Sequence, residues 1–232
     1  MATRSQVVLQ PAFVLSARPF RETSLLLECL SRDHGRVGLI ARGARGPRSR
    51  QRALLQVFQP LLLSWRESAD LGNLNAVEAN GAAVALKGEA VFCGWYLNEL
   101  LLRMLHRHDP QAAVYDLYAE SLRRLPQQLE PTLRRFELRL LQALGFGLDF
   151  PPALGPDRHY VFTPQLGFVA AAAHSRAVIR GDDIAALRDE TLRSPSALQA
   201  AKAVLRAALA PHLGGRPLQS AQRLRELRRR VG

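Results

Sequence analysis

The first 80 residues alternate short apolar runs with turn-forming residues, and this pattern limits the fold more than any other feature of the chain. Five runs are rich in Val, Leu, Ile and Phe: VVLQPAFVLSA, SLLLECLS, GRVGLIAR, FQPLLLSWRE and GNLNAVEA. Runs of this length and composition, separated by Gly, Pro, Asp and Arg, predict β-strands. Five short strands in succession predict a small antiparallel barrel, because closing the sheet removes its exposed edges.

The hydrophobic pattern changes to a helical period after Ala79. Three helices are predicted in GAAVALKGEAVFCGWYLNELLLRMLHRH, QAAVYDLYAESLRRL and EPTLRRFELRLLQALGFG, and a hairpin is predicted in HYVFTPQLGFVA. Ser194 and Pro195 form a good start for a further helix. We therefore expect an α+β protein with an N-terminal five-stranded OB-fold β-barrel at residues 1–80. A mainly α-helical domain at residues 81–232 should follow it, with an irregular insert at about 146–180.

The charge of the chain is strongly basic and unevenly distributed. The sequence has 32 Lys and Arg against 20 Asp and Glu, a formal net charge of +12. Residues 1–80 hold 11 basic and 6 acidic residues, residues 81–201 hold 13 of each, and residues 202–232 hold 8 and 1. Such an excess points to a polyanionic partner, nucleic acid before an anionic membrane surface. We find no recognisable secretion signal or membrane span, and expect a cytoplasmic, nucleoid-associated protein without a membrane role.

The densest basic segment is ARGARGPRSRQRA, residues 41–53, which contains five arginines and no acidic residue. Gly and Pro keep such a segment out of regular structure, and the planar guanidinium group suits phosphate oxygens. The composition by itself fits a phosphate-binding loop and a solvated turn equally well.

Residues suited to catalysis or metal binding are few. The chain has neither a P-loop nor a dinucleotide-binding glycine motif. We expect His106–Asp109 to be a solvated helix end, and Asp182 and Asp183 to lie at the start of a helix, where carboxylates are favourable. Cys29 and Cys93 lack the spacing of a zinc site and should be buried, reduced thiols. The sequence therefore predicts no catalytic residue, no metal and no cofactor.

Three phenylalanines lie in or beside the predicted strands. Core packing is the usual role of such residues, and we expect it for Phe13 and Phe58. Phe20 lies between Arg18 and Arg21 in RPFRE. It is the candidate for stacking on a nucleobase.

Three blocks occur in a characteristic order: RPFRETSLLL, HGRV and ARGARGPRSR. Together they resemble the N-terminal part of the RecO family of bacterial DNA repair proteins, and GRPLQS near the C-terminus resembles the family more weakly. The resemblance implies an OB fold followed by a helical domain, binding to single- and double-stranded DNA, and annealing of complementary strands. It also implies work with RecR and single-strand-binding protein in loading RecA. Some members carry a four-cysteine zinc module in the region matching 150–180, where this chain has no cysteine, so no zinc is expected.

The resemblance favours phosphate binding for the arginine segment and gives two sets of candidate residues. The first set contains the candidate nucleic-acid-binding residues: Arg18, Arg21, Arg42, Arg45, Arg48, Arg50 and Arg52 near the barrel, and Arg223, Arg225, Arg228 and Arg229 in the last segment. The alternative for the last segment is a frayed, solubilising tail. The second set contains the candidate residues for the acidic, apolar C-terminal tail of single-strand-binding protein: Arg134, Arg135, Arg139, Leu144 and Phe146. Ordinary core packing is the more usual role for the leucine of this second set, whereas its arginines are freer to be exposed.

These observations predict a DNA-binding mediator of recombination and annealing that is not an enzyme. An RNA-binding or ribosome-associated factor would carry the same charge. A metal-dependent nuclease that uses Asp182, Asp183 and nearby histidines is the alternative among enzymes.

Overall fold

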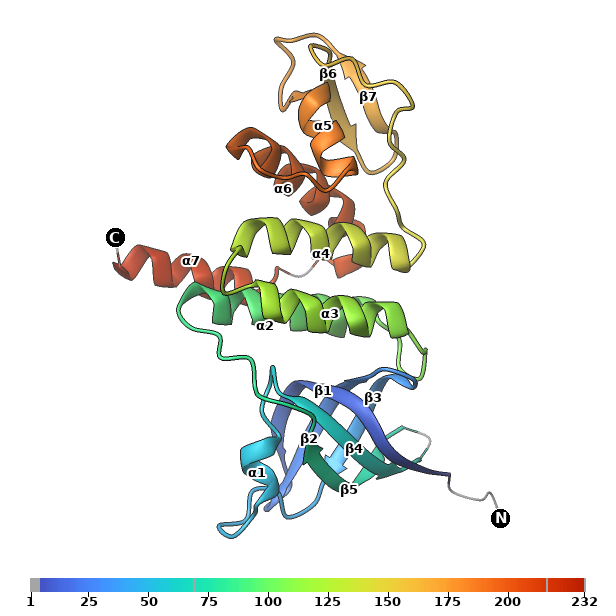
Figure 1. The fold of residues 1–232 in the computed structure, drawn as a ribbon, viewed down its shortest axis with the longest axis vertical. Coiled ribbons are helices and arrows are strands. Elements are labelled where there is room, and N and C mark those ends of the chain that lie inside the picture. Colours follow the sequence, from blue (N-terminus) through green and yellow to red (C-terminus); the bar gives the residue numbers. More distant parts are fainter. Residues whose placement is uncertain (1–4, 69, 216, 232) are drawn as a thin grey trace. The chain divides into compact units, whose positions relative to one another are not determined.

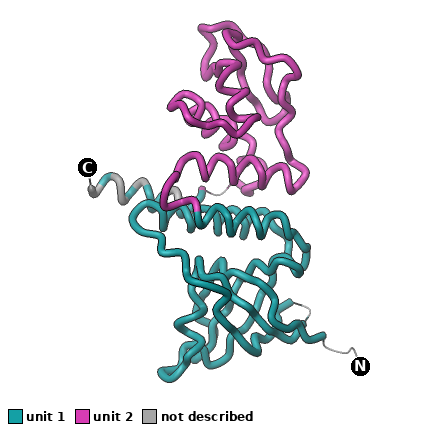
Figure 2. The backbone as a smooth tube through the Cα atoms, viewed as in Figure 1, with its two compact units in different colours: residues 1–123, 218–232 teal, residues 124–217 magenta. Residues whose placement is uncertain are grey.

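The computed structural model describes residues 5–68, 70–215 and 217–231. Its contacts divide the chain into two compact units, residues 1–123 with 218–232 and residues 124–217 (Figure 2). The first unit contains the strands of the N-terminal third, the two helices that follow them and the C-terminal helix. The expected domains, 1–80 and 81–232, follow the change from strands to helices instead, and they stay a prediction.

The N-terminal strands form a closed barrel (Figure 1). They are β1 (Gln6–Phe20), β2 (Ser24–Ser31), β3 (Gly35–Ala41), β4 (Pro60–Arg66) and β5 (Gly72–Ala79). The order around the barrel is β1-β2-β3-β5-β4, and only β3 and β5 pair in parallel. The predicted five-stranded barrel is confirmed, but the prediction that all its strand pairs are antiparallel was wrong, because β3 and β5 meet in parallel where the barrel closes. A short helix, α1 (Gln51–Leu54), lies between β3 and β4, inside the segment expected to be irregular.

The barrel core follows the two-residue period of its strands. Alternate side chains on β3 and β4 are buried, namely Val37, Leu39 and Ala41 and then Leu61, Leu63 and Trp65. Cys29 on β2 is fully buried, and this burial raises the pKa of its thiol far above the ordinary value. Both cysteines are buried and reduced, as predicted.

Two helices of the same unit pack against β1. They are α2 (Glu89–Met104) and α3 (Ala112–Arg124). The amide of Asn98 donates to the backbone oxygen of Leu15 at 2.9 Å, and the hydroxyl of Tyr118 donates to the side-chain oxygen of Asn98 at 2.5 Å. The ring of Phe13 lies against Tyr118, with centroids 5.1 Å apart, so Phe13 is a core residue as expected. The prediction that helix begins near residue 81 was wrong, because Gly88 adopts a φ of 55° and α2 begins only after it.

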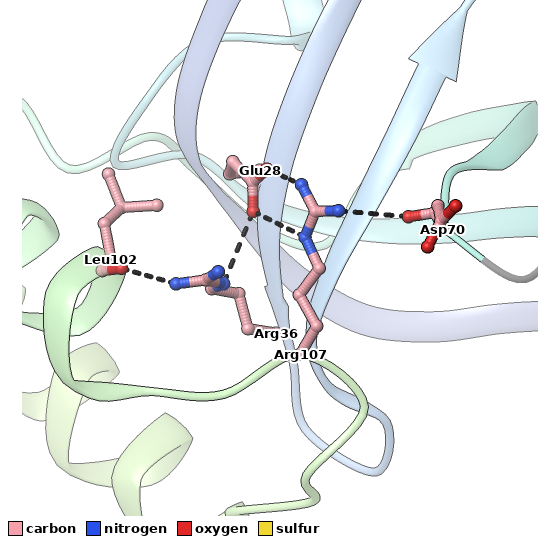
Figure 3. Close-up of polar contacts among 5 residues, drawn as sticks. All are labelled: Glu28, Arg36, Asp70, Leu102 and Arg107. Carbon is pink, nitrogen blue, oxygen red and sulfur yellow. Dashed lines mark hydrogen bonds and ion pairs between the residues drawn. The ribbon is translucent and has the colours of Figure 1, made fainter.

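The connection after α2 is fastened to the barrel by a cluster of charged groups (Figure 3). The carboxylate of Glu28 on β2 accepts from the guanidinium of Arg107, and it pairs with Arg36 of β3 at 3.4 Å. Arg107 also donates to the backbone oxygen of Asp70 at 3.1 Å, and Arg36 donates to that of Leu102. His106 and His108 on either side are exposed, as predicted for a helix end. The prediction that Arg107 between them is also a solvated residue was wrong, because it pairs with Glu28.

The C-terminal helix α7 (Gln219–Val231) packs along α2 (Figure 1). Its first turn begins after Leu218, whose side chain has no oxygen to cap the free amides. The carboxylate of Glu99 on α2 supplies the cap. It accepts from the backbone N–H groups of Gln219 and Ser220, both at 3.0 Å, and from the Ser220 hydroxyl at 2.7 Å. The last basic segment is therefore a helix whose start is held by α2.

Burial opposes the ionisation of Glu99, but hydrogen bonds from Ser220 and Gln219 and the charge of Arg103 outweigh it. The pKa of Glu99 therefore lies below its ordinary value. A carboxylate at the start of a helix also interacts favourably with the helix dipole.

The second unit combines helices with a small sheet. It contains α4 (Leu129–Ala143), β6 (His159–Thr163), β7 (Gly167–Ala171), β8 (Ile179–Arg180), α5 (Gly181–Arg188), α6 (Pro195–Leu209) and the 3₁₀ turn η1 (Ala210–Leu213). The predicted hairpin is β6–β7, and β8 pairs on the other side of β6. Ser194 caps α6 by accepting from the Ala197 N–H at 3.1 Å, as its sequence predicted.

The segment at about 146–180, which was predicted to lack a zinc module, contains an aromatic cluster. Phe168 on β7 lies 4.9 Å from Phe162 on β6 and 5.6 Å from Phe150, measured between ring centroids. Within the described ranges no helix is long and apolar enough to cross a membrane.

Replacing Gly35 with alanine should strongly destabilise the first unit. Gly35 has a φ of 65°, and a Cβ there would lie 1.9 Å from the backbone oxygen of Asp109. Gly43 has a similar φ of 68° with no atom within 4 Å of such a Cβ. Gly43→Ala should lower the free energy of unfolding by about 1–2 kcal/mol, because alanine is only strained by the left-handed conformation. Gly35→Ala should lower it by about 3 kcal/mol or more, because the clash adds to this strain. Urea unfolding of both variants measures the difference, and equal costs would contradict it.

Replacing Glu99 with glutamine should loosen the start of α7. Glutamine keeps the shape of the side chain but loses the charge and one acceptor oxygen. Since the folded pKa of Glu99 is lowered, its contribution is present above its ordinary pKa and is lost as pH falls through the lowered value. Hydrogen exchange of residues 219–231 should become faster in Glu99→Gln at neutral pH. A control, Glu78→Gln at an exposed position of β5, should leave the exchange unchanged. Unchanged exchange in both variants would contradict this role of Glu99.

Candidate nucleic-acid interface

The arginine segment folds as a series of turns after β3. The N–H of Gly46 donates to the Gly43 oxygen, and that of Ser49 donates to the Gly46 oxygen, each at 3.0 Å. Ala44 is fully buried in the barrel core. The segment is therefore a turn structure anchored on the barrel, with its arginines on the outside.

Arg45 joins this segment to the turn between β1 and β2. Its backbone N–H donates to the oxygen of Thr23 at 2.8 Å. Its guanidinium donates to the oxygens of Arg21 and Glu22, both at 3.3 Å. The two connections, far apart in the sequence, thus form one surface. We call it the arginine face and define it by its exposed arginines: Arg18, Arg21, Arg42, Arg45, Arg48, Arg50 and Arg52.

Most of the charge on the arginine face is not neutralised by neighbouring carboxylates. In the part of the chain that the structure describes, its arginines form no ion pair. The arginines of the Glu28 cluster differ, since their charge is balanced by a half-buried carboxylate. Exposed guanidinium groups without acidic partners are available to phosphate oxygens.

Phe20 lies at the edge of the arginine face. It is the last residue of β1 and pairs with Ser24, the first residue of β2. Its ring is half-buried, and the guanidinium of Arg21 lies 5.3 Å from the ring centroid. Phe58 is buried, as expected for a core residue.

The predicted residues of the C-terminal segment lie on α7, in the same unit as the barrel. Arg223 and Arg229 are exposed, and the guanidinium of Arg223 lies 5.9 Å from the ring centroid of Trp95 on α2. The side chains of Arg225 and Arg228 fall outside the described residues.

The arginines expected to bind a partner peptide differ in exposure. Arg134 is only 5% exposed and pairs with Glu137 at 2.9 Å, so the expectation that it is exposed was wrong. Helical spacing explains this, because residues three apart share a face and this face of α4 is buried. Arg135 and Arg139 are more accessible, and the Nε of each donates at 2.8 Å to a different oxygen of Glu190.

The pKa of Glu190 is lowered: burial opposes its ionisation, but hydrogen bonds from Arg139 and Arg135 outweigh that effect. Leu144 is half-buried at the end of α4, where Gly145 takes a φ of 80° and the N–H of Phe146 donates to the Leu141 oxygen at 2.8 Å. The exposed ring of Phe146 stacks on His212, with centroids 4.0 Å apart.

The aspartates considered for a metal site lie in the first turn of α5, as predicted. Asp182 pairs with Arg180 at 3.4 Å, and Asp183 accepts from the Ser196 hydroxyl at 2.9 Å. Across the residues with described positions, no group of three His, Cys, Asp or Glu side chains could hold a metal ion.

Sequence reasoning missed the roles of three charged residues of the first unit, Glu28, Arg107 and Glu99. Glu28 had a detectable signal, because it is a lone charge within the apolar strand run SLLLECLS. Arg107 and Glu99 had none, because their partners are 79 and about 120 residues away in the sequence.

Comparisons with known proteins agree with this architecture. A family model described as "Recombination protein O N terminal" matches residues 5–82, and one described as "Recombination protein O C terminal" matches residues 86–151. A DNA repair protein RecO of Coxiella burnetii is 42% identical over 94% of this chain and 98% of its own length. Those of Thiobacillus denitrificans and Alkalilimnicola ehrlichii are 42% and 45% identical, over 98% and 97% of this chain and 95% and 93% of their own lengths. The chain belongs to the RecO family of DNA repair proteins.

Proposed function

We propose that the protein is a non-catalytic, DNA-binding mediator of recombinational repair. It binds single- and double-stranded DNA, anneals complementary strands and, with RecR, helps to load RecA onto DNA coated by single-strand-binding protein. The observation that carries this proposal is the arginine face. It gathers exposed, unneutralised arginines from two connections of an OB-type barrel, a fold whose loops commonly contact nucleic acid.

Phosphate contacts of this kind explain both binding and annealing. Guanidinium groups that bind phosphates release counterions and do not read the base sequence. Bringing two complementary strands together requires that their phosphate repulsion be reduced. The exposed Arg223 and Arg229 on α7 add to the positive charge of the same unit.

The test of this function is annealing of complementary strands that have been coated with single-strand-binding protein. The protein should accelerate annealing at moderate salt without cleaving either strand. Equal preference for structured RNA would instead support an RNA-binding factor. Metal-dependent cleavage that is lost on changing Asp182 and Asp183 would support a nuclease.

Removing Arg48 and Arg50 together should weaken binding to every DNA sequence. Both side chains are exposed and lie away from the barrel core. For two lost phosphate contacts, the slope of log K against log salt should flatten by about 1.4 for single strands and about 1.8 for duplex. The melting temperature should hardly change, since no core contact is lost.

The matched control is the double variant Arg176→Ala and Arg193→Ala, which removes two exposed arginines from the neutral part of the chain. It changes the net charge equally and should leave the salt slope nearly unchanged. The same loss of slope in both double variants would show that total charge, and not the arginine face, determines affinity.

The second unit is proposed to capture the acidic C-terminal tail of single-strand-binding protein. Such a peptide needs guanidinium groups for its carboxylates and an apolar surface for its terminal side chain. Arg135 and Arg139 already hold one carboxylate, that of Glu190, and Leu144 and the exposed ring of Phe146 follow on the same chain segment. This geometry supports the proposal for Arg135 and Arg139, whereas Arg134 is engaged with Glu137.

Replacing Arg139 with alanine should weaken binding of a labelled tail peptide by less than about tenfold, because the charge-assisted hydrogen bond that is lost would itself have displaced the bond from Arg139 to Glu190. Alanine is preferable to glutamate here, because a new carboxylate would stand beside Glu190. Binding to naked DNA should stay the same, and Arg193→Ala serves as the control. Full peptide affinity in a folded Arg139→Ala protein would place the site elsewhere.

A further inference from the structure

The position of Phe20 is unusual for an aromatic residue of a small barrel. Phe13, on the same strand, is 3% exposed and packs against Tyr115 and Tyr118. Phe20 ends that strand on the arginine face, and its ring is only partly buried. The exposed guanidinium of Arg21 lies over the Phe20 ring.

The turn beside Phe20 is held in a fixed shape. Arg21 adopts a φ of 51°, a conformation that non-glycine residues avoid unless their surroundings impose it. The guanidinium and backbone N–H of Arg45 bind three successive backbone oxygens of this turn, those of Arg21, Glu22 and Thr23. The ring therefore lies at a braced turn, which Arg45 joins to the arginine segment of a different connection.

A ring among phosphate-binding groups is the arrangement that single-stranded nucleic acid requires. The strand's phosphates bind the basic groups, and its unpaired bases stack on aromatic faces. A duplex offers the same phosphates, but its base faces are already covered by their neighbours. Exposed cation–π pairs are weaker than base–aromatic stacking, so a base can displace Arg21 from the ring.

We propose that Phe20 is a base-stacking residue, at which an unpaired nucleobase of single-stranded DNA stacks while neighbouring arginines bind the flanking phosphates. The proposal rests on the proposed DNA-binding function and deepens it in two ways. Phe20 contributes to affinity for single strands and not for duplexes. Arg45 acts as a positioning residue that braces the turn.

The experiment compares two oligonucleotides of equal length, oligothymidylate and a strand of abasic sites with the same number of phosphates. The unchanged protein should bind oligothymidylate about 5-fold to 150-fold more tightly, as expected for one stacked base. Phe20→Leu, which keeps an apolar side chain but removes the aromatic face, should bind both strands alike. Its affinity for duplex DNA and its salt slope should remain those of the unchanged protein.

A second variant, Phe20→Trp, keeps an aromatic face and guards against a folding defect in the first. It should retain the preference for oligothymidylate, and its added tryptophan fluorescence should be quenched by oligothymidylate and not by the abasic strand. Arg48→Ala should weaken binding to both strands equally, because it acts on phosphates.

The outcomes separate the two proposals. Binding to neither strand by the unchanged protein would overturn the proposed function. Equal binding of both strands by the unchanged protein, or an undiminished preference for oligothymidylate in Phe20→Leu, would overturn the role of Phe20 while leaving DNA binding intact.

Discussion

The half-buried carboxylate of Glu28 is the interaction on which the first unit depends. It stands on β2 among apolar neighbours, and burying it without partners would be costly. Arg36 from the next strand and Arg107 from the connection after α2 both bind it. Arg107 then reaches the connection before β5, and Arg36 reaches the end of α2 (Figure 3). One charge thus ties together two strands, a loop and a helix.

The ion pairs of Glu28 hold the middle of β2, and this also affects the start of the strand. The strand begins at Ser24, directly after the turn that Arg45 braces, so the arginine face is built on a strand that is held at both places. Ala44 is fully buried behind the turn, while the arginines of the same segment are exposed. Exposed guanidinium groups on a braced backbone suit a ligand that is bound through its phosphates and not through its sequence.

The sequence predicted the strands of the barrel well because each is a short apolar run with clear turn residues at its ends. It failed where structure depends on distant partners. The two residues of β8 form a strand only by pairing with β6, and α1 interrupts a segment whose composition suggests no helix. For the site, the exposure of Arg48 and Arg50 followed from composition, whereas the bracing role of Arg45 follows only from the backbone oxygens that folding brings beside it. Arg134 could not be distinguished from Arg135 by type, since only packing decides which face of α4 is buried.

The arginines of this chain therefore fall into three groups with different partners, which the net charge of +12 does not reveal. Arg36, Arg107 and Arg134 balance buried or half-buried carboxylates and add little to the field outside the protein. Arg135 and Arg139 share the carboxylate of Glu190, so a peptide carboxylate must compete with an internal one and gains only the difference in free energy. An apolar contact such as Phe146 then becomes necessary for affinity as well as for orientation. Among the residues described, no carboxylate pairs with the arginines of the arginine face, although the guanidinium of Arg45 is bound to backbone oxygens. A phosphate that binds the other arginines of this face gains the full charge-assisted interaction, which is why we propose DNA as the ligand of the barrel and the acidic peptide as the ligand of the second unit.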